Sequence, residues 1–161
     1  MDNKVSYEEP FRSYALKYFE IHADHRLRVF QFYIVLSALI IGGFFTILKT
    51  GENYRWLSLL GFLVTFLSIV FSKMDRRTRM LVKNAEAALK YLDDQHHLPD
   101  MEGKPHVLRL FTRDDAITQT ASRWPLVDGH FSYSRVFRWV FVVFGLTGSA
   151  VGLICLFFLP A

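Results

Sequence analysis

Two short clusters hold most of the residues in this chain that could do chemistry. The first is residues 22–28, His-Ala-Asp-His-Arg-Leu-Arg, and the second is residues 75–79, Asp-Arg-Arg-Thr-Arg. Together they place two imidazoles, two carboxylates and five guanidinium groups beside long uncharged segments. Guanidinium groups bind phosphates and carboxylates through paired N–H donors, and imidazoles change charge near neutral pH. The two clusters are therefore the first place to look for a binding site.

These clusters have three interpretations. In the first, their charges reach to lipid headgroups and pair with one another, Asp24 or Asp75 with Arg26 or Arg79, which fixes helix register. In the second, they bind an anionic lipid or a phosphate-bearing ligand in a pH-sensitive manner. In the third, the histidines and Asp24 bind a metal ion, although no Cys or Glu at ligand spacing completes that site. The candidate ligand-binding residues are His22, His25, Arg26, Arg76, Arg77 and Arg79.

The other candidates for catalysis or metal binding are weak. His96, His97, His106 and His130 are scattered among Pro and Gly without the spacing of a zinc site. The lone Cys155 lies within an uncharged segment, and the chain has neither a Gly-x-Ser-x-Gly motif nor a Gly-rich phosphate loop. We therefore expect no enzyme activity, no cofactor and no metal site.

Long uncharged segments are the elements that must position the clusters. The chain has 161 residues, of which 52% are hydrophobic, and it carries no charge in residues 29–48, 56–72 and 139–159. Each segment can cross a hydrocarbon layer of about 30 Å as a helix, which satisfies its own peptide groups. The apolar content excludes a disordered chain, the single Cys155 excludes a disulfide scaffold, and the uncharged segments disfavour a water-soluble domain. This distribution predicts an all-α membrane protein with three transmembrane helices.

The distribution of Lys and Arg predicts the orientation of these helices. Five Lys and Arg precede the first segment, two lie in the loop 49–55, twelve lie in residues 73–138, and none follows residue 159. Positive charge concentrates on the cytoplasmic side of bacterial membrane proteins. We therefore expect a bacterial inner-membrane protein with a cytoplasmic amino terminus and a periplasmic carboxyl terminus.

The expected organisation has four parts. Residues 1–28 form a cytoplasmic amphipathic helix, residues 29–72 a transmembrane hairpin, residues 73–135 a cytoplasmic helix and cap, and residues 136–159 the third transmembrane helix. Gly51 suits the tight turn of the hairpin. Because the arms of the hairpin leave the membrane side by side, they should continue as a long cytoplasmic helical hairpin.

Apolar residues at helical spacing predict how this hairpin packs. Leu81, Ala85, Ala88 and Leu92 form the expected seam of the second arm. Breakers at Pro99, Gly103, Pro105, Pro125 and Gly129 mark a small helical cap, with a short helix from Thr112 to Ser122. Ser134 is the expected N-cap of the third transmembrane helix.

Small residues at four-residue spacing predict close helix contacts in the membrane. The patterns are Ala38-x-x-x-Gly42, Gly145-x-x-x-Ser149 and Gly148-x-x-x-Gly152. Three spans enclose no conduit wide enough for an ion, so conduction would require several copies around an axis. Their sparse hydroxyls would then line a mainly hydrophobic constriction.

The order of these elements resembles a group of small bacterial membrane effectors of anti-phage systems, which includes SLATT-like two-span effectors and the membrane effector of the Hailong system. The resemblance is carried by the run at residues 22–27, the short hairpin, the run at residues 75–79 and the helical continuation Leu-Val-Lys-Asn-Ala-Glu-Ala-Ala-Leu at residues 81–89. It covers about residues 11 to 95, and the two-span members lack the third span.

This resemblance implies a homo-oligomeric, channel-like toxin. Its members accompany nucleotidyltransferases or reverse transcriptases, which implies control from the cytoplasm by a nucleotide or oligonucleotide made by a partner enzyme, with membrane depolarisation as the output. The alternative function is a non-conducting membrane anchor that holds a soluble partner through its cytoplasmic cap. Membrane potential after expression of the protein with and without its partner genes separates these two functions.

Overall fold

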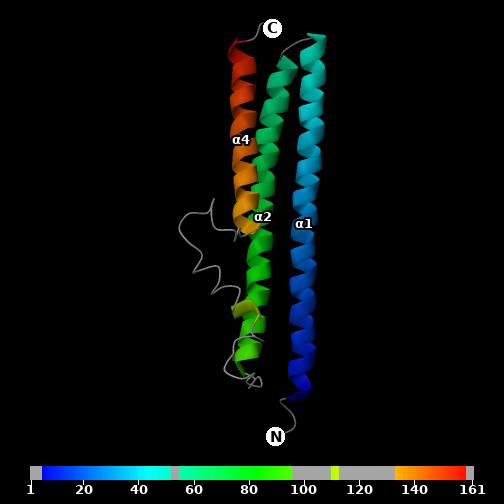
Figure 1. Ribbon diagram of the computed structural model, residues 1–161, viewed down its shortest axis with the longest axis vertical. Helices are drawn as coiled ribbons and strands as arrows, with labels where there is room; N and C mark the ends of the chain where they lie inside the picture. Colours follow the sequence, from blue (N-terminus) through cyan, green and yellow to red (C-terminus); the bar gives the residue numbers. More distant parts are fainter. Residues whose placement is uncertain (1–4, 52–54, 96–109, 113–132, 159–161) are drawn as a thin grey trace. The chain divides into compact units, whose positions relative to one another are not determined.

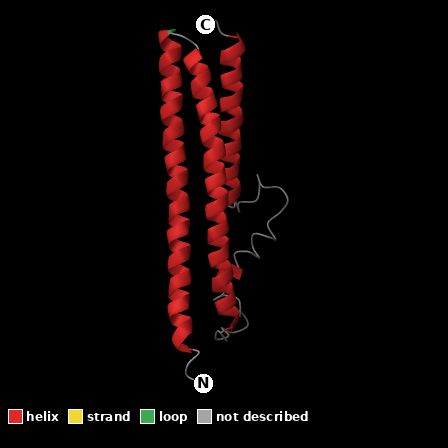
Figure 2. Cartoon of the chain, turned by 180° about the vertical axis from the view of Figure 1, so that it is seen from behind, coloured by secondary structure: helices red, strands yellow, loops and turns green. Residues whose placement is uncertain are grey.

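The chain is helical throughout the part that is described. The computed structural model describes residues 5–51, 55–95, 110–112 and 133–158, and these contain no strand (Figure 2). Helix α1 spans Val5–Thr50, α2 spans Arg55–Gln95 and α4 spans Tyr133–Phe158 (Figure 1). Each has a stretch that is long and apolar enough to cross a membrane. The expected all-α fold with three such helices is confirmed.

The described residues fall into two compact units. We call residues 25–51, 55–77 and 133–158 the membrane unit, and residues 5–24, 78–95 and 110–112 the polar unit. Helices α1 and α2 contribute to both units, whereas α4 lies wholly in the membrane unit. Most of the expected cap lies outside the described residues, as do all of its histidines and most of the helix predicted from Thr112 to Ser122.

The turn after α1 has the glycine that its geometry needs. Gly51 has a positive φ of 68°, and its N–H donates to the carbonyl oxygen of Ile47 at 3.2 Å. This is the left-handed cap that ends many helices, and glycine adopts it without steric cost because it has no Cβ. The sequence-based prediction of a turn at Gly51 is confirmed.

An aromatic core holds the membrane unit together. Helix α2 runs antiparallel to both α1 and α4 (Figure 1), so residues far apart in the sequence meet. Tyr33 of α1, Phe71 of α2 and both Phe137 and Phe141 of α4 are buried together, and Phe30 stacks on Phe137 with ring centroids 3.9 Å apart. The Tyr33 hydroxyl lies 2.8 Å from that of Ser68, which itself donates to the Val64 carbonyl. The hydroxyls of Tyr33 and Ser68 within this apolar core are therefore hydrogen-bonded.

Helices α2 and α4 approach closely because glycines face each other. A Cβ on Gly61 would lie 2.7 Å from the Gly152 backbone nitrogen and 2.8 Å from the Gly148 carbonyl oxygen. The Thr65 hydroxyl lies 3.1 Å from both the Gly145 carbonyl oxygen and the Ser149 hydroxyl. Small residues that admit the neighbouring backbone, joined by hydroxyl hydrogen bonds, are a common way to pack helices in lipid. The two Gly-containing patterns of the third span therefore make the contacts expected of them.

The polar unit packs along a seam that differs by one residue from the expected one. Ala85 and Leu92 are buried as expected, but Leu81 and Ala88 are only half-buried, and Val82 and Leu89 take their places. Neighbouring residues on a helix point about 100° apart, so the rotation of α2 about its axis decides which of two neighbours is buried.

Other contacts join α1 to the rest of the polar unit. Ala15 of α1 is buried in this unit, and the ion pair between Arg12 and Asp93 joins α1 and α2 at 3.2 Å. The described part of the cap reaches α1 through Phe111, whose ring meets Phe19 edge-on at 5.4 Å.

Candidate functional site

Arg26 and Asp75 form a two-point ion pair in the membrane unit. Arg26 Nε donates to Asp75 Oδ1 at 2.6 Å, and Nη2 donates to Oδ2 at 3.3 Å. Only 13% of the Arg26 side chain and 12% of the Asp75 side chain are exposed. Planar guanidinium and carboxylate groups meet here in the bidentate arrangement that gives both strength and a fixed geometry. This pair therefore sets the register of α1 against α2.

The third helix also contacts this pair. Arg26 Nη1 donates to the Ser134 hydroxyl at 3.1 Å, and its guanidinium carbon lies 5.2 Å from the centre of the Phe137 ring. The expected N-cap role of Ser134 is wrong, because α4 begins at Tyr133 and the Ser134 side chain accepts a hydrogen bond from Arg26. Arg26 thus binds one group on α2 and two on α4, and its pairing with Asp75 confirms the first interpretation of the clusters for these two residues.

The remaining candidate ligand-binding residues divide between the two units. His22 and Arg79 belong to the polar unit, whereas His25, Arg76 and Arg77 belong to the membrane unit with Arg26. His22 stacks on Tyr18 with ring centroids 4.1 Å apart, and its Nδ1 lies 2.8 Å from the Tyr18 carbonyl oxygen. That contact holds the imidazole against its own helix.

The candidates with exposed side chains are those best placed to meet a ligand. His25, Arg76 and Arg77 are exposed, Arg79 is half-buried, and Arg26 is mostly buried in its ion pair. Arg76 also lines a groove between α2 and α4 in the membrane unit. Exposed guanidinium groups retain their donors for an incoming anion, whereas those of Arg26 are held by Asp75 and Ser134. Whether any of these residues binds a ligand stays a prediction.

The third interpretation of the clusters was a metal ion. Within the described ranges, no group of three or more His, Cys, Asp or Glu side chains is arranged to hold a metal ion. His22 points its Nδ1 at a backbone carbonyl of its own helix, which leaves that atom unsuited to bind a cation.

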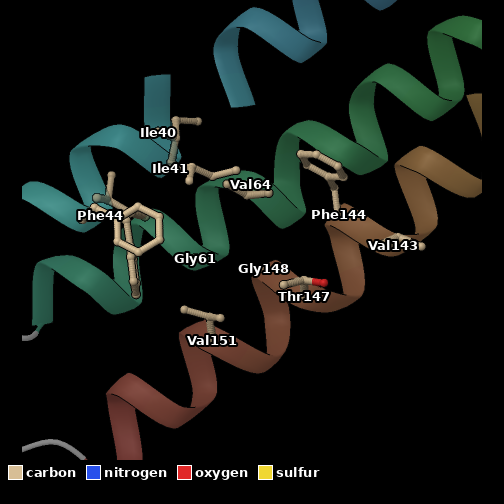
Figure 3. Close-up of a pocket in the computed structure, with 12 residues that line it drawn as sticks. Ile40, Ile41, Phe44, Gly61, Val64, Val143, Phe144, Thr147, Gly148 and Val151 are labelled. Atoms are coloured by element: carbon tan, nitrogen blue, oxygen red, sulfur yellow. The ribbon is translucent and has the colours of Figure 1, made fainter. Parts of the chain in front are cut away.

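A second feature of the membrane unit is an apolar pocket of about 290 Å³ among its three helices. Figure 3 shows Phe44 from α1, Val64 from α2 and Phe144 and Val151 from α4 around it, close to the point where Gly61 faces Gly148. Thr147 contributes the one hydroxyl group among its lining side chains. With so few polar groups the pocket has no means to bind or activate a polar substrate, and hydrocarbon is the material that fits it.

Comparison with known proteins assigns the chain to a family. The model of the octameric membrane protein family matches residues 13–159. The chain belongs to this family. It is also 36% identical, over 133 residues that cover 82% of each chain, to CD-NTase-associated protein 19 of Escherichia coli. No solved structure matches this chain.

Family membership refines the expectations drawn from the sequence. It places this chain among oligomeric membrane proteins, and together with the name of the relative it supports an effector of anti-phage defence. The family model and the relative do not support the narrower assignment to the SLATT-like or Hailong-type effectors. The family is described as a membrane protein family and the relative as an associated protein, and neither is described as an enzyme.

Sequence reasoning missed the role of Gly61 in packing, although it counted Thr65 among the hydroxyl residues expected to make helix contacts. Gly61 lies against the backbone of α4, and Thr65 hydrogen-bonds α4 one turn later. The two residues form a Gly-x-x-x-Thr pattern in the second uncharged segment. The same small-residue rule that selected Gly148 and Gly152 could have found Gly61.

Proposed function

We propose that copies of this chain assemble around an axis into a membrane pore that depolarises the infected cell. The observation that carries this proposal is membership of an octameric membrane protein family by a chain with three apolar helices. Tyr33, Phe71, Phe137 and Phe141 fill the interior of the membrane unit, so a single copy offers ions no path through it. A conduit therefore has to form between copies.

The pore is gated from the cytoplasm by an anionic nucleotide or oligonucleotide. The relative is named for its association with a CD-NTase, which suggests a nucleotide-producing partner for this chain as well. The cations that would contact such a ligand are Arg76, Arg77 and Arg79 of the second cluster, and His22 and His25 of the first cluster are the further candidates. Arg26 would act by positioning, because its guanidinium is held by Asp75. A ligand that binds the open or the closed arrangement more tightly shifts the population toward that arrangement.

Ion flux from liposomes tests this function directly. Purified protein is reconstituted into potassium-loaded vesicles, and efflux is followed with and without a panel of cyclic and linear dinucleotides. The expected result is efflux that at least one nucleotide switches on or off, from particles whose mass in native mass spectrometry corresponds to eight chains. No efflux under any condition, with a partner protein captured through the cytoplasmic segment, would instead favour the non-conducting anchor.

Variants of the exposed cations test the gating step. Replacing Arg76, Arg77 and Arg79 with Gln should raise the nucleotide concentration needed for half-maximal response by about tenfold for each contact that is lost, because a charge-assisted contact contributes about 1.5 kcal/mol or more. The matched control is Lys83→Gln, since Lys83 is an exposed cation paired with Glu86 on the same helix and such pairs contribute little. An unchanged response in the triple variant would remove these residues from the ligand site.

A further inference from the structure

A groove of about 380 Å³ runs between α2 and α4 of the membrane unit and combines two chemistries. At one end it is lined by two cations, Lys73 and Arg76, which lie one helical turn apart on α2. Beyond these cations it is lined by the apolar side chains of Ile69, Val142 and Leu146 and by the hydroxyls of Thr65, Ser68, Ser72 and Ser149, of which those of Thr65, Ser68 and Ser149 are hydrogen-bonded within the protein. From Arg76 to Thr65 the groove follows eleven helical steps of α2, or about 16 Å at 1.5 Å per residue. The groove is therefore cationic at one end and mainly apolar over the rest of its length.

The two cations are available to a ligand. Lys73 and Arg76 are exposed, and no carboxylate in the described part of the chain forms an ion pair with either. Arg26, in the same unit, differs because Asp75 neutralises its charge. The groove thus has a net positive end, and that end lies where the apolar part of α2 gives way to the charged run at residues 75–79. In a membrane protein this is the depth of the lipid headgroups.

We propose that this groove binds one anionic phospholipid. Its phosphate lies between Lys73 and Arg76, and one acyl chain follows the groove past Ile69, Val142 and Leu146. The groove matches both parts of such a lipid, because cationic pockets between membrane helices select anionic headgroups and apolar side chains suit a hydrocarbon chain. A nucleotide matches only the cationic end, since it has no hydrocarbon chain to place against the apolar walls.

The apolar pocket near Gly61 provides the contrast within the same unit. It is smaller, about 290 Å³, and no charged residue lines it, so it has no means to select among headgroups. Selectivity for an anionic lipid is therefore expected from the groove between α2 and α4. The inference does not rest on the proposed pore function, and it holds equally for a non-conducting protein.

Native mass spectrometry of the full chain in detergent tests this site. Micelles have no charged bilayer surface, so the lipid that remains bound reports local contacts. The protein is titrated with phosphatidylglycerol and, separately, with phosphatidylcholine. We expect tighter binding of phosphatidylglycerol, and the double variant Lys73→Gln with Arg76→Gln should lose about fivefold in its affinity for each charge removed, with phosphatidylcholine binding unchanged.

Two further variants separate the headgroup from the chain. Arg135→Gln with Arg138→Gln removes two exposed cations of α4 outside the groove and should retain the affinity of the natural protein. Val142→Trp narrows the groove and should weaken both lipids equally, because it blocks the acyl chain without changing the charge. The charge-preserving pair Lys73→Arg with Arg76→Lys should restore phosphatidylglycerol binding, which distinguishes loss of the site from loss of folding.

Three results would overturn the inference. The first is equal loss in the Lys73/Arg76 and Arg135/Arg138 double variants, which would mean general attraction to positive charge. The second is full competition by millimolar inorganic phosphate, which would mean a phosphate site that needs no hydrocarbon. The third is equal affinity for both lipids in the natural protein.

Discussion

Arg26 shows how one residue among many like it acquires a distinct role. It is one of five arginines in the two charged clusters, and it joins three helices of the membrane unit, through Asp75 on α2 and through Ser134 and Phe137 on α4. Burial makes its ion pair sensitive to change, because removing one partner leaves the other charge without compensation in a poorly solvated place. Because its guanidinium is held within the protein, we expect the role of Arg26 to be structural.

Breaking the Arg26–Asp75 pair from one side should therefore be costly. We expect Asp75→Asn or Arg26→Gln to lower the free energy of unfolding of the membrane unit by about 3 kcal/mol. The apolar double variant Arg26→Met with Asp75→Leu should lose less than either single variant, since it leaves no charge unpaired. Thermal unfolding in detergent, followed by circular dichroism, measures the differences.

The control for this experiment is Arg77→Gln, which removes an exposed arginine two residues from Asp75. Its unfolding temperature should match that of the natural protein. A double variant that is less stable than both single variants would show that the pair contributes net stability beyond avoiding an unpaired charge.

At the scale of the helices, small residues decide which surfaces meet. The exposed side of α1 carries the pattern Ala38-x-x-x-Gly42, but a Cβ added to Gly42 would meet nothing within 4 Å. Gly61 and Gly148, by contrast, lie against backbone atoms of the opposite helix. The same four-residue pattern thus marks a helix contact in α2 and α4 but an open surface in α1. The rotation of each helix about its own axis decides which of the two it is.

Adding one methyl group distinguishes these surfaces. Gly61→Ala should destabilise the membrane unit by about 1–3 kcal/mol, because backbone atoms at 2.7–2.9 Å from the new Cβ must shift. Gly42→Ala is the matched control and should leave the unfolding temperature unchanged, since its Cβ enters open space within one copy. A lowered unfolding temperature for Gly42→Ala would mean that this side of α1 packs against another copy.

For the whole molecule, the count of membrane crossings sets where its ends lie. If all three apolar helices cross the membrane, the two termini lie on opposite sides, and the excess of Lys and Arg before the first span and between the second and third leads us to expect a cytoplasmic amino terminus. The topology also determines which compartment can supply a ligand to the charged clusters at residues 22–28 and 75–79.

Reporter fusions test this topology. Green fluorescent protein fused to the amino terminus should fluoresce in the cytoplasm, and alkaline phosphatase fused to the carboxyl terminus should be active in the periplasm. Reciprocal fusions, with each reporter at the other end, should both be inactive. Activity of one reporter at both ends would exclude an odd number of crossings.

The sequence alone was sufficient for the properties that depend on distance along the chain. Uncharged lengths near that of the membrane core predicted three helices, and Gly51 predicted their first turn, because lipid and peptide geometry act on every such segment alike. The tertiary structure decided everything that depends on helix rotation. It selected Asp75 as the partner of Arg26 and buried Val82 and Leu89 in the seam of the polar unit. It also placed Gly61 at the closest approach of α2 and α4, and it placed Lys73 and Arg76 at the end of the groove between these two helices. A turn of about 100° exchanges one residue for the next on a helix, and only the packing of distant side chains fixes that turn.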